Sequence, residues 1–193
     1  MPRRAAEHMG AQRERILRAA IACIGDLGLE RTSVAEIARA AKLSPASLYT
    51  HFAGKDAIVA EALRYGAATN DALPANWAGF KAAVAGMEDP LGFDGVTIAR
   101  TRLHLFASSV RPGPIHDLLK PMFAGSLAAA ARHLAALEEA GEIRLRMSAA
   151  RTATAISALV DGLTWIGLAN DRAAGEVSAD IEAALDCLVD RPG

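Results

Sequence analysis

The chain has 193 residues, of which 52% are apolar and 22% charged, and its formal net charge is −1. This length allows a buried core, and the apolar fraction excludes a disordered chain. No uninterrupted apolar run reaches the roughly 20 residues of a membrane span, and no secretory signal is recognisable, so we expect a cytoplasmic protein without a membrane partner. Cys23 and Cys187 lie far apart, which argues against a disulfide framework or a zinc site.

Composition favours an all-α fold. The chain contains 44 alanines and only 5% aromatic residues, and alanine has the highest helix propensity. Charge is divided unevenly, because residues 1–55 carry nine Lys or Arg and five Asp or Glu, whereas residues 56–193 carry twelve and seventeen. A basic first part joined to an acidic remainder suggests nucleic acid as the partner of the first part.

Three helices are predicted near the start of the chain. Apolar residues at helical spacing between Ile16 and Leu27, followed by Gly28, predict the first. Ser33 opens the second as a capping box, and the pair at 44–45, Ser then Pro, opens a third over about 45–52. Further helices are predicted at about 55–70, 76–87 and 91–110, from the break at 112–114 to 140, and at 148–169 and 178–189. No strand is predicted.

The two short helices joined by a tight turn indicate a helix-turn-helix unit, whose second helix enters the DNA major groove. At about 100° per residue, with Leu48 and Phe52 in the core, the other side of this helix faces outward. The exposed residues are then Ala46, Ser47, Tyr49 and Thr50. An uncharged, small face permits close approach to base edges. Basic residues that could hold phosphates surround it: Arg3, Arg4, Arg31, Arg39, Lys42 and Lys55.

Two stretches, Thr32–Ala38 and the Leu43–Phe52 segment that ends in L-Y-x-H-F, are followed by Lys55. Through them, residues 15–63 resemble the DNA-binding head of the tetracycline-repressor (TetR) family of bacterial transcription regulators. The resemblance implies a three-helix DNA-binding domain at 1–54, a connecting helix at about 55–70, and a helical effector-binding and dimerisation domain at 55–193. It implies DNA contacts at Ser33, Ser44, Ala46, Ser47, Tyr49, Thr50, His51 and Lys55.

The predicted reading helix departs from common base recognition. Nothing between Pro45 and Thr50 is Arg, Lys, Asn or Gln, so bidentate base contacts worth about 1–3 kcal/mol each are unavailable from it. We therefore expect sequence choice to depend on van der Waals contacts, backbone donors, DNA shape or the N-terminal arginines.

The remaining residues suggest a dimer interface and a pocket for a small, largely apolar effector. By the resemblance, the interface lies on the last two long helices, at Ile156, Leu159, Val160, Leu163, Ile166, Ile181, Leu185 and Leu188. The same stripes could instead face the core of one chain. Candidate pocket residues in the middle helices are Trp77, Phe80, Phe93, Arg100, Leu103, His104, Phe106, Met122, Phe123 and Trp165. Arg100 and His104, one turn apart, could bind an anionic group.

The function expected is that of a bacterial transcriptional regulator, a repressor that binds a pseudo-palindromic double-stranded operator as a homodimer and is released by an effector. The alternatives are a helical protein-binding adaptor and an all-α enzyme. The five histidines form no H-E-x-x-H pattern, and neither a P-loop nor a G-x-S-x-G motif is present. We therefore expect no enzyme, no metal and no cofactor.

Overall fold

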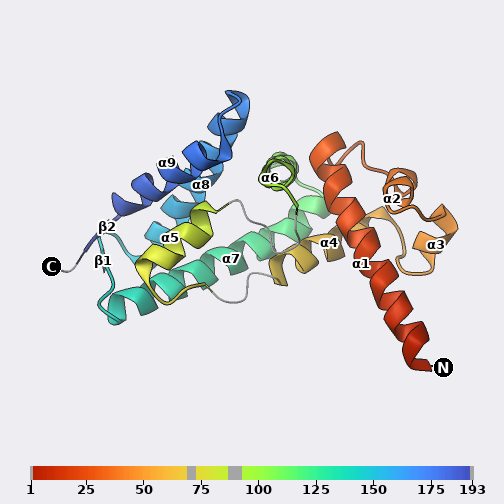
Figure 1. The fold of residues 1–193 in the computed structure, drawn as a ribbon, viewed down its shortest axis with the longest axis horizontal. Helices are drawn as coiled ribbons and strands as arrows, with labels where there is room; N and C mark the ends of the chain where they lie inside the picture. The colour runs from red at the N-terminus through yellow and green to blue at the C-terminus, as the bar shows by residue number, and fades with distance from the viewer. Residues whose placement is uncertain (1, 69–72, 87–92, 192–193) are drawn as a thin grey trace. The chain divides into compact units, whose positions relative to one another are not determined.

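The computed structural model describes residues 2–68, 73–86 and 93–191. Over these residues the chain is all-helical apart from one pair of two-residue strands, which confirms the predicted fold class (Figure 1). The elements are α1 (Pro2–Leu27), α2 (Val34–Ala40), α3 (Pro45–Tyr49), α4 (Lys55–Ala68), α5 (Trp77–Ala85), α6 (Gly95–Ser109), α7 (Pro114–Glu139), β1 (Arg144–Leu145), α8 (Ala149–Ala169), α9 (Ala174–Asp186) and β2 (Val189–Asp190).

Contacts group these elements into two compact units. The first contains α1 to α4, most of α6 and the first residues of α7, and the second contains α5, the remainder of α7, α8, α9 and the strands. The helix expected to connect two domains, α4, packs against α1. The functional boundary expected between residues 54 and 55 stays a prediction.

The first unit has a core in which α1 contacts α2 and α4, and α2 contacts α3 (Figure 1). The apolar stripe of α1 is buried, as its spacing predicts, and each of the other helices adds one or two aliphatic side chains. The buried residues include Ile16, Leu17, Ala20, Ile21, Ile37, Ala38, Leu48, Phe52, Ile58 and Ala62.

Local hydrogen bonds explain the tight turn between α2 and α3. Lys42 has a left-handed conformation, with φ of 53°. Its N–H donates to the Arg39 carbonyl at 3.1 Å, and the Leu43 N–H donates to the Ala38 carbonyl at 2.9 Å. This pair of bonds is a Schellman motif, which satisfies carbonyls at the end of α2. The same motif ends α7 at Gly141, with φ of 75°.

The second unit has its own core between α5, α7, α8 and α9. The Trp77 and Phe80 rings stack at 5.5 Å between centroids, and Phe80 stacks on His133 at 5.4 Å. Lys81 is buried and donates to Asp186 at 2.6 Å, and the Trp77 indole N–H donates to the same carboxylate at 2.8 Å. Burial alone would raise the pKa of Asp186, but these hydrogen bonds and the Lys81 charge outweigh it and lower that pKa.

Some element boundaries differ from those predicted. Helix α3 ends at Tyr49, where Thr50 is the C-cap, instead of at residue 52. Helix α9 begins at Ala174, before the predicted 178, because its N-cap, Ala173, offers no side-chain cap that a sequence pattern could reveal. Its predicted end was wrong too, since Val189 pairs antiparallel with Leu145. The predicted helix ends at 69–70, 87 and 91–92 lie outside the described residues.

Among the described helices, α8 is long and apolar enough to cross a bilayer, judged by length and composition only. Its best 18-residue window has a mean hydropathy of 1.3, and 28% of that window is buried within the chain. The search for uninterrupted apolar runs missed it because polar residues, among them Arg151, Thr152 and Asp161, interrupt the helix. An apolar helix with so little burial leaves apolar surface uncovered by its own chain.

Candidate nucleic-acid interface

Helix α3 is held to the core by one side and presents the other to solvent. Leu48 is fully buried and Phe52 nearly so, whereas Ala46 and Thr50 are exposed and Tyr49 is 60% exposed. Ser47 is half-buried. The face predicted from helical geometry is therefore the face that the structure exposes, and it carries no charge.

The hydroxyl groups at and before α3 make hydrogen bonds to the backbone. Ser33 and Ser44 cap α2 and α3, each accepting a backbone N–H at 3.1 Å, from Glu36 and Ser47 respectively. Because each serine oxygen acts as an acceptor, its hydroxyl hydrogen is available to a phosphate oxygen. Thr50 instead donates its hydroxyl hydrogen to the Ser47 carbonyl at 2.6 Å. Its oxygen therefore retains lone pairs that can accept from a base amino group.

The predicted capping box at α2 forms only in half. The Glu36 carboxylate, expected to return to the Ser33 N–H, instead accepts from the Arg39 guanidinium at 2.7 and 3.2 Å. This hydrogen bond and the Glu36 charge raise the pKa of Arg39, which stays protonated. The exposed Arg39 is thus partly neutralised, whereas Arg31 and Lys42 are exposed and form no ion pair with a described residue.

His51 and Lys55, both expected at phosphates, also have partners inside the protein. The His51 Nε2 lies 3.2 Å from the Gln12 side-chain oxygen of α1. The Lys55 ammonium donates to the Leu29 carbonyl at 2.6 Å, which ties the start of α4 to the turn after α1. An ammonium has three donors, so this bond leaves two for another acceptor.

Arg13 is a residue that sequence reasoning missed. Its Nε donates to Glu61 of α4 at 2.6 Å, and a second nitrogen contacts the other oxygen of that carboxylate. A further bond of 3.0 Å reaches the His51 carbonyl, and the guanidinium lies 4.4 Å from the centre of the Phe52 ring. Arg13 therefore fixes the end of the reading helix against α1 and α4. The sequence offered one signal for this role, because Arg13 lies three residues before Ile16 and therefore on the same side of α1 as its buried stripe.

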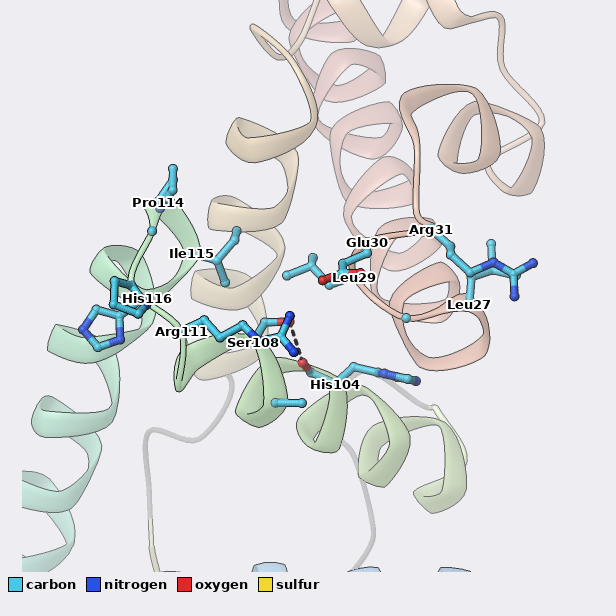
Figure 2. A pocket seen from close by; sticks show the side chains of 14 residues that line it. Leu27, Leu29, Glu30, Arg31, His104, Ser108, Arg111, Pro114, Ile115 and His116 are labelled. Atoms are coloured by element: carbon cyan, nitrogen blue, oxygen red, sulfur yellow. Dashed lines mark hydrogen bonds between the residues drawn. The ribbon is translucent and has the colours of Figure 1, made fainter.

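The residues predicted for an effector pocket are divided between the two units. In the first, Phe93 is half-buried under Arg18, Arg100, Leu103 and Phe106 are exposed, and His104 lines a cavity of about 480 Å³ (Figure 2). In the second, Trp77 and Phe80 are core residues, Met122 and Phe123 are half-buried, and Trp165 is 54% exposed. The effector pocket stays a prediction.

The residues predicted for the dimer interface fall into two groups. Ile156, Val160, Ile181 and Leu185 are buried in the core of the second unit, where α8 and α9 pack together. Leu159, Leu163, Ile166 and Leu188 keep exposed surface. The apolar stripes of α8 and α9 pack against each other within one chain. Only the residues beside these buried stripes are therefore available to a second chain.

Comparisons with known proteins agree with this geometry. Residues 16–62 match the model of the bacterial regulatory proteins of the tetR family, and this match covers the C-terminal part of α1, all of α2 and α3, and most of α4. A comparison of the sequence with curated proteins gives no match.

Solved structures share the fold over nearly the whole chain. A TetR-family transcriptional regulator from Rhodococcus sp. has a TM-score of 0.77 and 23% identity, covering 93% of this chain and 98% of its own. A transcriptional regulator from Saccharomonospora viridis, in complex with choline, has a TM-score of 0.70 and 22% identity over 94% of this chain and 100% of its own. A fatty acid degradation regulator from Bacillus halodurans has a TM-score of 0.65 and 15% identity, covering 90% and 94%.

Proposed function

We propose that this chain, whose residues 16–62 match the model of the bacterial regulatory proteins of the tetR family, is a homodimeric repressor released from its operator by a small molecule. The observation that carries the proposal is the outward face of α3, which is small, uncharged and fixed to the core by Leu48 and Arg13. A face of this kind suits contact with base edges, with the phosphate contacts placed around it.

In the proposed complex, the exposed side of α3 lies in the major groove. The Thr50 oxygen would accept from a base amino group, and Ala46 would meet a thymine methyl group. Ser33, Ser44, Tyr49 and Lys55 would donate to phosphates on either side of the groove. Lys42, exposed in the turn between α2 and α3, would add another phosphate contact.

We place the dimer interface on the outward face of α8. By helical geometry the residues opposite the buried Ile156 and Val160 are mostly apolar or small, namely Ala155, Ala158, Gly162, Trp165 and Ala169, with Leu159 and Ile166 at the edge of this face. Arg151, Thr154 and Asp161 also lie on it. Trp165 is 54% and Ile166 44% exposed in the single chain. A mostly apolar strip between Ala155 and Ala169 is a surface that a second copy would cover, and a two-fold axis would present two α3 helices to one operator.

Release from the operator requires only that the effector binds one conformation of the dimer, the one that does not bind DNA, more tightly than the conformation that does. A preference of about 100-fold shifts the equilibrium by about 2.7 kcal/mol. The structure from Saccharomonospora viridis holds choline, and the one from Bacillus halodurans is named as a regulator of fatty acid degradation. For this chain we propose a small, largely apolar effector and a cytoplasmic location, and we propose no catalytic activity.

The deciding experiment is selection of bound duplexes from a random DNA pool at about 0.15 M salt, followed by sequencing. The proposal expects an enriched inverted repeat with half-sites roughly one helical turn, about 34–36 Å, apart. Selection with Thr50→Ala is expected to change the preferred base at one position of each half-site. Ser109→Ala is the matched control, because that hydroxyl also donates to the carbonyl three residues earlier, but on α6. A soluble protein that enriches no sequence would refute the proposal.

A further inference from the structure

The cavity in the first unit is lined by none of the residues that we place on operator DNA, although Arg31, one of the basic residues around the reading helix, belongs to its wall. It has a volume of about 480 Å³, within the range of small-molecule sites (Figure 2). One wall is the turn after α1, residues 27–31, and the other is the end of α6 and the start of α7, residues 104–116. Of the residues expected to bind an effector, His104 belongs to this wall.

Three charged side chains line the cavity, Glu30, Arg31 and Arg111, and the Arg31 side chain extends away from the other two (Figure 2). Figure 2 shows the Arg111 side chain extending into the cavity from one wall, with Glu30 on the opposite wall. Neither forms a hydrogen bond or an ion pair with another residue in the part of the chain that the structure describes. A guanidinium suits a carboxylate in two-point geometry, and a carboxylate suits a protonated amine. The pair therefore complements a ligand that carries both charges.

The other lining residues form the frame of this cavity. Ile115 supplies most of the apolar surface, because Leu29, also in the wall, is only 5% exposed. His116 is held at 2.5 Å by the Ser109 carbonyl, so it caps the end of α6 and is less available to a ligand. The His104 ring lies against Gly28, where a Cβ would come within 3.2 Å of it. Gly28 also has φ of 79°, which an L side chain rarely adopts, so glycine at this position lets the two walls approach.

We propose that this cavity is a binding site for a small zwitterion with an apolar body, of the type of an apolar α-amino acid. Its carboxylate binds Arg111, its protonated amine binds Glu30, and its apolar part packs between Leu29 and Ile115. The site belongs to the DNA-binding unit and is additional to the effector pocket predicted from the middle helices.

Ligand binding here would act on the operator through the turn after α1. The Leu29 carbonyl in the cavity wall accepts from Lys55 at 2.6 Å, and the buried Thr32 hydroxyl donates to the Gly28 carbonyl at 2.8 Å. A ligand that shifts Leu29 therefore shifts the acceptor that orients Lys55, which we place at a phosphate. This regulatory consequence rests on the proposed function, whereas the binding itself does not.

Calorimetric titration of the full chain with three matched probes tests the binding. L-leucine carries both charges, isocaproate lacks the amine, and isoamylamine lacks the carboxylate. We expect L-leucine to bind, and each of the other two to bind at least about tenfold more weakly, a difference of about 1.4 kcal/mol. Arg111→Gln and Glu30→Gln should each weaken L-leucine binding by at least about tenfold. The controls Arg64→Gln and Glu139→Gln, both at exposed positions outside the cavity, should leave it unchanged.

Three results would overturn the inference. The first is no saturable L-leucine binding up to about 10 mM, and the second is L-leucine binding that survives both cavity substitutions. The third is isocaproate binding as tightly as L-leucine and insensitive to Glu30→Gln, which would make the cavity a plain anion site. Operator affinity measured with and without L-leucine tests the regulatory part separately. If no operator exists, the calorimetry still decides whether the site binds the zwitterion.

Discussion

Arg13 and Glu61, 48 residues apart in the chain, form a two-point ion pair that joins α1 to α4 beside the end of the reading helix. Arg13→Met keeps an unbranched side chain over Phe52 but removes the guanidinium that binds both carboxylate oxygens of Glu61. We expect the free energy of unfolding to fall by about 1–2 kcal/mol, a moderate value because the two side chains are 40% and 30% exposed. Operator affinity should fall several-fold.

The salt dependence of operator binding separates positioning from direct contact. Arg13→Met should leave the slope of log affinity against log salt unchanged, because Arg13 points into the protein and not toward a phosphate. Arg132→Met, at an exposed position on α7, controls for loss of one positive charge. A slope about one unit shallower in Arg13→Met would show instead that Arg13 contacts DNA.

Lys42→Gly should have opposite effects on folding and on DNA binding. Lys42 has φ of 53°, a conformation that glycine adopts without steric cost, so we expect the variant to be about 0.5 kcal/mol more stable to urea. Operator binding should weaken, with a salt slope about one unit shallower, because a phosphate contact is lost. Increased stability with unchanged DNA binding would show that Lys42 does not contact DNA.

Gly162→Glu tests the dimer interface without disturbing the chain's own core. No atom lies within 4 Å of a Cβ built at Gly162, and replacing a helical glycine stabilises a helix by about 0.5–1 kcal/mol. A carboxylate on the outward face of α8 should nevertheless prevent association, so sedimentation velocity should give a folded monomer that binds operator poorly.

The control for that substitution is Gly125→Glu on α7, an exposed glycine at which a Cβ also meets no atom within 4 Å. It should remain dimeric and bind operator normally. A dimeric Gly162→Glu protein would place the interface elsewhere.

Low pH should destabilise the second unit, because the Asp186 carboxylate becomes protonated. Its pKa is lower in the folded chain than the unfolded value of about 3.9, so its contribution to stability is complete above about pH 4. That contribution is lost as the pH falls from about 4 through the folded pKa. Asp186→Asn should therefore be less stable than the natural chain at pH 7, by about 1 kcal/mol, with the difference narrowing below about pH 4.

The value of about 1 kcal/mol for Asp186→Asn is modest because the Asp186 carboxyl is 40% exposed, although its partner Lys81 is buried. Asp190→Asn is the control, since it removes an exposed ion pair with Arg146. Urea unfolding between about pH 3 and 7 provides the measurement. A difference between Asp186→Asn and the natural chain that grows toward low pH would contradict the assignment.

The sequence by itself determined the features that depend on neighbours within a few residues. Ser33 and Ser44 begin α2 and α3 because each accepts the backbone N–H three residues later, and Leu48 with Phe52 defines which side of the reading helix is exposed. The same local pattern carries the resemblance to the tetR family, whose model matches residues 16–62. Helix α9 was the exception, because its first residue follows an alanine without a capping side chain.

Only the tertiary structure decided which residues from distant segments meet. The Arg13 bonds to Glu61, the Lys55 bond to the Leu29 carbonyl and the cavity between residues 27–31 and 104–116 join segments that are 26 or more positions apart. It also decided which apolar stripe is core: Ile181 and Leu185 are buried, whereas Trp165 is exposed. Helical period shows that a face is apolar, but the packing of α8 against α9 determines which of two apolar faces remains for a partner.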